Sequence, residues 1–145
     1  MKYLLIIEDD PFKATSLKEF VALHRNFDQV FIASSLVEAI ELVNERIYDL
    51  VLIDMAIPSH PTESGGGSPM SFLTGGLEAL FELNQLDRPD QCIIITQYDI
   101  EIAGQFYSVE DAERVISEEL NCKLSACILY DESNDKWKEK LLKHI

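Results

Sequence analysis

Five short, almost wholly apolar runs recur along this chain, and segments with helical spacing separate them. The runs are rich in leucine, isoleucine and valine, as expected of strands that are buried on both faces of a parallel sheet. Strands that alternate with helices form βαβ units, so the pattern predicts an α/β fold. The five predicted strands cover residues 3–7, 29–33, 49–54, 92–96 and 124–130.

The segments between these runs carry the signals of helix ends. Asp10 is placed to cap a helix that begins at Pro11, because proline is favoured at the first helical position. Ser35 and Glu38 have the spacing of a capping box for the second helix. The stripe of the first helix that should face the core contains Leu17, Phe20, Val21 and Leu23. Further helices are predicted over residues 77–86, 109–120 and 136–145, with a looser stretch at 97–107.

Composition limits the class of protein. The 145 residues have the length of one domain, predicted to span 1–145 with a long inserted loop at about 59–75. The formal net charge of -14 argues against a surface that binds nucleic acid, which needs clustered cations. No apolar run approaches the roughly 20 residues of a membrane span, and no signal peptide is evident, so we expect a cytoplasmic protein. The 3 cysteines lack the spacing of a zinc motif or a disulfide framework.

Acidic residues follow two of the predicted strands. Glu8 and Asp9 come directly after the first run, and Asp54 closes the third. Ligands of doubly wound sheets bind beyond the carboxyl ends of the strands, so these acids would meet there if the two strands are neighbours. Their mutual repulsion favours a bound cation, and carboxylates suit Mg²⁺. A carboxylate beside Mg²⁺ can attack a phosphoryl group. A single acid at a strand end usually begins a polar loop, but three together are harder to dismiss.

Several motifs resemble those of response-regulator receiver domains. The stretch I-I-E-D-D at 6–10 is similar to the acidic pair of that family, and D-L-V-L-I-D-M-A-I-P at 49–58 is similar to its central strand. The run G-L-E-A-L at 76–80 resembles the start of its third helix, and Thr96 matches its hydroxyl position. The resemblance covers essentially the whole chain, with the strongest motifs before residue 81.

The resemblance implies a fold and a set of roles. The fold would be a three-layer αβα sandwich, flavodoxin-like, with a doubly wound parallel five-stranded sheet in the order 2-1-3-4-5. Asp54 would be the phosphoacceptor, and Thr96 would donate a hydrogen bond to its phosphoryl group. Asp9 would bind Mg²⁺ directly, Glu8 through water, and Ala56 through its backbone carbonyl. A histidine kinase or a phosphotransfer protein would be the phosphoryl donor, and a downstream protein would receive the signal.

The chain departs from the family after its fifth predicted strand. The family carries a lysine at the end of that strand, followed by proline, whereas this chain has Tyr130 and Asp131. A tyrosine hydroxyl can donate a hydrogen bond but carries no charge, and Lys136 or Lys138 could reach back to supply one. The chain also has two insertions relative to the family, one after the third strand and one between the fourth and fifth.

Three functions compete on this evidence. The first is a stand-alone receiver in phosphorelay (two-component) signalling, which is no enzyme apart from slow autodephosphorylation. The second is a phosphorylation-independent pseudo-receiver that acts as a protein–protein interaction module, favoured by Tyr130, Asp131 and the two insertions. The third is a metal-dependent phosphohydrolase, which would need an acid two residues after the nucleophile. Ala56 stands at that position and argues against it.

Overall fold

The computed structural model describes residues 1–58 and 75–145, and its main sheet has five parallel strands. The strands lie in the order β2-β1-β3-β4-β7. When only the strands of this sheet are numbered along the chain, β7 is the fifth and the order is 2-1-3-4-5. The predicted flavodoxin-like fold is therefore confirmed. The predicted inserted loop lies outside the described residues except for Gly75. The strands are β1 (Tyr3–Ile7), β2 (Gln29–Ala33), β3 (Leu50–Ile53), β4 (Gln91–Thr96) and β7 (Ala126–Leu129).

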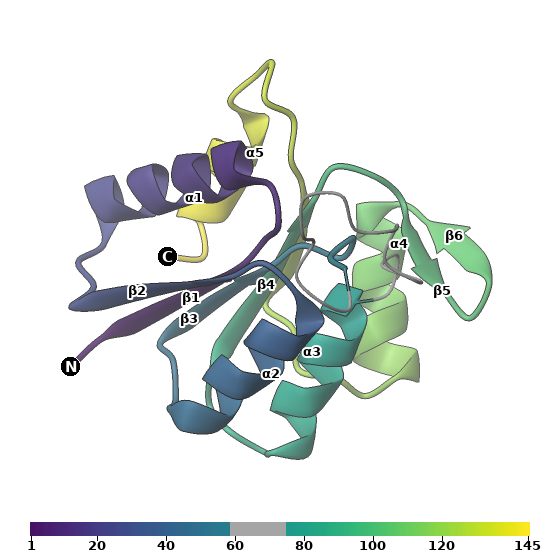
Figure 1. Ribbon diagram of the computed structural model, residues 1–145. Coiled ribbons are helices and arrows are strands. Elements are labelled where there is room, and N and C mark those ends of the chain that lie inside the picture. Colours follow the sequence, from purple (N-terminus) through teal and green to yellow (C-terminus); the bar gives the residue numbers. More distant parts are fainter. Residues whose placement is uncertain (59–74) are drawn as a thin grey trace, which may run out of the picture.

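Helices cover both faces of this sheet, as Figure 1 shows. On one face lie α1 (Pro11–His24) and α5 (Lys136–Leu142). On the other lie α2 (Leu36–Glu45), α3 (Gly75–Gln85) and α4 (Val109–Arg114). Alternate residues of one strand serve the two layers, since Leu4 and Ile6 pack beneath α1 whereas Leu5 and Ile7 pack beneath α2 and α3. Both faces are therefore apolar, which explains the nearly continuous apolar runs in the sequence.

The helix caps follow the predicted chemistry. The Asp10 side chain accepts a hydrogen bond from the Phe12 N–H at 2.9 Å, and Ser35 Oγ accepts one from the Glu38 N–H at 3.2 Å. The prediction that Leu23 faces the core was wrong, because that side chain is 79% exposed. The buried residues of α1 are Lys13, Ala14, Leu17 and Val21. Within the described ranges, no helix is both long enough and apolar enough to cross a membrane.

The stretch at 97–107 contains a β-hairpin that the sequence did not predict. Strands β5 (Ile100–Ile102) and β6 (Gln105–Tyr107) pair antiparallel and form a small sheet of their own beside α4 (Figure 1). Both isoleucines of β5 are buried and belong to the core under α4. The predicted helix at 109–120 is also divided, because α4 continues into the π-helical turn η1 (Val115–Glu119).

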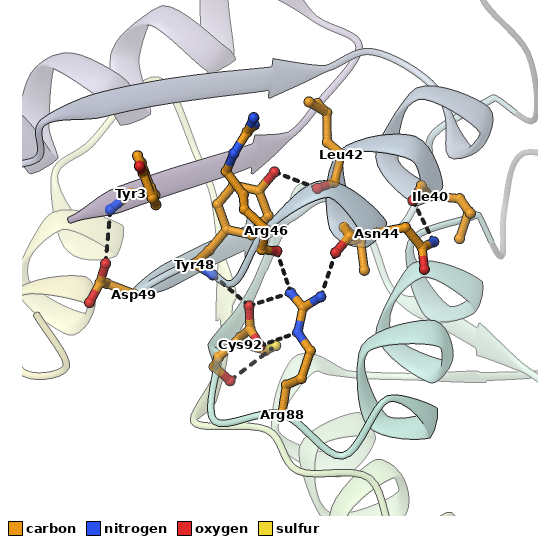
Figure 2. Close-up of polar contacts among 11 residues, drawn as sticks. Tyr3, Ile40, Leu42, Asn44, Arg46, Tyr48, Asp49, Arg88 and Cys92 are labelled. Carbon is orange, nitrogen blue, oxygen red and sulfur yellow. Dashed lines mark hydrogen bonds and ion pairs between the residues drawn. The ribbon is translucent and has the colours of Figure 1, made fainter. Parts of the chain in front are cut away.

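A polar network closes the end of the sheet where the strands begin, and Figure 2 shows it. The Arg88 guanidinium pairs with the carboxylate of Asp90 at 2.8 Å and donates to the backbone carbonyls of Val43 and Arg46. The same carboxylate accepts a hydrogen bond from the Tyr48 N–H at 2.8 Å. The network therefore ties the end of α2 to the segments that lead into β3 and β4.

Candidate acidic metal site

The three acids that follow β1 and β3 meet at the opposite edge of the sheet. The two strands are neighbours, and the Asp54 N–H donates a hydrogen bond to the Ile7 carbonyl at 2.9 Å. One carboxylate oxygen from each of Glu8, Asp9 and Asp54 lies within 4.8 Å of the other two. Glu8 and Asp54 are buried, whereas Asp9 is exposed. The structure thus brings together the three side chains that the sequence placed at this edge.

Burial makes negative charge unfavourable at this site. The pKa of Glu8 is raised to about 7, mainly by desolvation and also by the nearby Asp54 carboxylate, while Lys13 acts in the opposite direction. Desolvation also raises the pKa of Asp9. A cation bound among these carboxylates would stabilise their ionised forms. The negative electrostatic potential of the site therefore favours binding of a cation.

The donor atoms fit Mg²⁺. Glu8 Oε1 is buried and accepts no hydrogen bond, although it forms an ion pair with Lys13 at 2.7 Å, so this carboxylate oxygen keeps a lone pair for a metal ion. Mg²⁺ prefers oxygen ligands and keeps several of its waters, so it uses one or two carboxylates directly. Separations of up to 4.8 Å between the carboxylate oxygens suit such a mixture of direct and water-mediated ligands. Glu8, Asp9 and Asp54 would hold the ion.

A buried lysine from α1 also enters this site, and the sequence analysis missed it. Lys13 Nζ lies 3.1 Å from Asp54 Oδ1 and 2.7 Å from Glu8 Oε1, the latter contact being an ion pair without hydrogen-bond alignment. It also donates a hydrogen bond to the Ile95 carbonyl at 2.8 Å. The expectation that a lysine of the last helix reaches back is not supported for Lys138, which pairs with Asp135 at 3.2 Å.

The remaining predicted site residues lie around the acids. Thr96 ends β4 and is buried, and its carbonyl accepts a hydrogen bond from the Tyr130 N–H at 2.7 Å. Tyr130 presents its ring to Lys13, whose Nζ lies 5.3 Å from the ring centroid. Ala56 lies two residues after Asp54 and is half-buried. Their roles toward a phosphoryl group stay predictions.

The backbone of Asp54 leaves no room for a side chain at Gly76, in the first turn of α3. A Cβ atom built at Gly76 would lie 2.2 Å from the Asp54 carbonyl oxygen, closer than real contacts allow. The Gly76 N–H also donates a hydrogen bond to the Met55 carbonyl at 3.1 Å. The first turn of α3 thus packs directly on the backbone that carries Asp54, and any larger residue would push the two apart.

Comparisons with known proteins agree with this geometry. The family model "Response regulator receiver domain" matches residues 4–122. The Detocs response regulatory protein DtcB of Vibrio alginolyticus is 31% identical over 147 residues, covering 98% of each chain. A CheY-like receiver domain protein from Methanospirillum hungatei superposes with a TM-score of 0.66 at 23% identity, covering 99% of this chain and 90% of that one. The response regulator TrrA of Thermotoga maritima, solved with Mg(2+)-BeF, gives 0.63 at 21% identity over 100% of both chains.

Proposed function

Because the chain belongs to the response-regulator receiver family of two-component signalling, we propose that Asp54 accepts a phosphoryl group with the help of Mg²⁺. Receiver domains are signalling phosphoacceptors rather than enzymes, and they pair with histidine kinases. The observation that carries the proposal is the meeting of Glu8, Asp9 and Asp54 at the carboxyl edge of the sheet. A histidine kinase or a phosphotransfer protein would be the donor, and a downstream protein would read the result.

The proposed reaction is a single displacement at phosphorus. A carboxylate oxygen of Asp54 forms the new P–O bond while the bond from phosphorus to the leaving group breaks, and the leaving group takes the electron pair. With acetyl phosphate as donor, acetate leaves. Bound Mg²⁺ would supply positive charge that offsets the charge of the transferring phosphoryl group. Glu8, Asp9, Asp54 and the Ala56 carbonyl would hold the ion, and Thr96 would donate to a phosphoryl oxygen.

Two relatives support parts of this proposal. TrrA was solved with Mg(2+)-BeF, which supports a magnesium site in a chain of the same fold. The relative from Vibrio alginolyticus bears the name of a response regulatory protein, and we propose a comparable regulatory role for this chain.

Intact-mass spectrometry after incubation with Mg²⁺ and acetyl phosphate tests the proposal. The wild-type chain should gain the mass of one phosphoryl group, and removal of Mg²⁺ with EDTA should prevent this. The Asp54→Asn variant should gain none, because an amide is a poor nucleophile. Glu41→Gln, which makes the matching acid-to-amide change on the exposed face of α2, should be modified like wild type. If neither acetyl phosphate nor phosphoramidate modifies the wild type while calorimetry shows bound Mg²⁺, the proposal fails.

A second candidate, the phosphorylation-independent interaction module, has its own observation. The β5–β6 hairpin and the loop before it expose two aromatic side chains, Tyr98 at 69% and Phe106 at 65%. Exposed aromatic rings are common in protein–protein contacts. This function predicts that Asp54→Asn and wild type bind the same partner equally well, whereas a phosphorylation switch predicts that only wild type responds to acetyl phosphate.

A further inference from the structure

We propose that Lys13 of α1 is the cation of the acceptor site in this chain. It holds the Asp54 carboxylate in the unmodified state and contacts the phosphoryl group after transfer, a task for which the family pattern expects a lysine at position 130. The inference rests on the proposed function, since it assigns a residue to the same site. It differs from the sequence-based expectation, which looked for this charge on the last helix.

The contacts of Lys13 are those of a residue held in place. Its side chain is 1% exposed, and a buried ammonium group is strongly destabilising unless it is paired. Oxygens of Glu8, Asp54 and Ile95 surround Nζ, at 2.7, 3.1 and 2.8 Å respectively. Nζ donates hydrogen bonds to Asp54 Oδ1 and to the Ile95 carbonyl, and its contact with Glu8 Oε1 is an ion pair. The tip of the side chain thus lies between the ends of β3 and β4, beside the acceptor carboxylate.

Charge balance gives this lysine a function beyond packing. Glu8, Asp9 and Asp54 carry three formal negative charges when ionised, of which Mg²⁺ would cancel two. Lys13 cancels the third. Phosphorylation of Asp54 replaces a monoanion by a dianion, so the need for a cation at this position increases. Among the described residues, Lys13 is the only lysine or arginine in an ion pair with Asp54.

The residue at the end of β7 fits this arrangement. Tyr130 is buried, and Lys13 Nζ lies over its ring, 5.3 Å from the centroid, within the range of a cation–π interaction. A lysine at position 130 would place a second ammonium group beside the first, with unfavourable repulsion. The aromatic ring instead covers Lys13 and attracts its charge. The tyrosine that follows β7, where the family has a lysine, and the buried lysine on α1 are therefore parts of one arrangement.

The test compares Lys13→Met with Lys18→Met, an exposed lysine on the same helix. Circular dichroism first confirms that each variant is folded. With Mg²⁺ and acetyl phosphate, Lys13→Met should be phosphorylated about 10- to 100-fold more slowly than wild type, the loss expected for a contact to a charged group. Lys18→Met should match wild type. A folded Lys13→Met protein that is phosphorylated at the wild-type rate overturns the inference.

A second variant separates loss of charge from loss of packing. In Lys13→Met/Tyr130→Lys, the ammonium group is supplied from the residue that follows β7 instead of from α1. If Lys13 acts through its charge on the acceptor, this double variant should regain a large part of the rate. No recovery in a folded double variant, together with a wild-type rate for Lys13→Gln, assigns Lys13 a purely structural role.

Calorimetric titration with Mg²⁺ keeps the two proposals distinguishable. If the wild type takes up no phosphate, the proposed function is contradicted. The Mg²⁺ titration then tests by itself whether Lys13 acts as a cation of the acidic site. Removal of a positive charge beside the acids should tighten Mg²⁺ binding about tenfold in Lys13→Met. Equal affinities overturn the inference. So does binding in Lys13→Met with none in wild type, because Lys13 would then replace the metal ion.

Discussion

Lys13 stands in the first turn of α1, where a positive charge faces the positive end of the helix dipole. The cost of this position and of burial is offset by Glu8 and Asp54, which lie within ion-pair distance. Residues that break local preferences in this way tend to cluster at functional sites.

The sequence carried a signal for this residue. Lys13 precedes Leu17 by four positions and so shares the buried face of the helix. The predicted apolar stripe begins at Leu17, because lysine is rarely buried. It includes Leu23, whose side chain is exposed.

The thiols of Cys92 and Cys127 should be chemically inert in the folded protein. Burial raises the pKa of each to about 12. At pH 8 the thiolate fraction is then on the order of one in ten thousand, and the thiolate is the reactive form. Iodoacetamide should modify both far more slowly in the native protein than in urea, where all 3 cysteines react. Native alkylation at the rate of a free thiol would contradict this.

The raised pKa values of these two thiols also determine how the free energy of unfolding changes with pH. The folded state favours the neutral thiols, so their contribution to the free energy of unfolding is complete below about pH 9. It is lost as the pH rises from about 9 towards 12. Replacement of Cys92 and Cys127 by alanine should weaken this alkaline loss, which urea titrations at pH 8 and 10 can measure.

At the level of elements, strong local signals were read correctly and weak ones were missed. The strands of the main sheet were predicted because each is a run of apolar residues, and the caps at Asp10 and Ser35 have specific chemistry. The β5–β6 hairpin was missed because its strands are three residues long, too short for an alternating pattern to stand out. Its turn, Ala103-Gly104, also lacks the asparagine or aspartate that usually signals this geometry.

Ala103 offers a way to stabilise that hairpin. Its φ of 51° lies in the left-handed region, which disfavours alanine and which asparagine tolerates better. Ala103→Asn creates an Asn-Gly turn and should raise the free energy of unfolding by about 1 kcal/mol. Urea denaturation measures the change, with Ala22→Asn on α1 as a control that should destabilise. A lower stability for Ala103→Asn would contradict the prediction, and an unchanged stability would show that the hairpin does not take part in the cooperative unit.

At the scale of the whole molecule, the two ends of the parallel strands have different roles. The acids and Lys13 lie where β1 and β3 end, and the Arg88 network lies where β3 and β4 begin. Periodicity predicted the parallel sheet, but it contains no information on which strands are neighbours. The strand order came from the resemblance to receiver domains, and Asp9 meets Asp54 only because β1 lies beside β3.

Loss of the Arg88 side chain should therefore lower stability without changing the chemistry. In Arg88→Met the Asp90 carboxylate, 1% exposed, loses its ion-pair partner, which should cost about 3 kcal/mol of the free energy of unfolding. Lys123→Met removes an exposed pair at 3.7 Å and should change stability by less than about 0.5 kcal/mol. Both variants should take up phosphate from acetyl phosphate like wild type. A phosphorylation defect in folded Arg88→Met would contradict this separation of the two ends.

The ring of Trp137 packs on the ring of Tyr130, with centroids 5.0 Å apart, and Tyr130 in turn covers Lys13. Trp137 is also the single tryptophan of the chain. Tryptophan fluorescence therefore comes from one side chain, which is linked to the Asp54 carboxylate through Tyr130 and Lys13. Any rearrangement that shifts Lys13 or Tyr130 changes the surroundings of that indole, so the protein contains its own optical probe, and rapid-mixing experiments can follow the site without an attached dye.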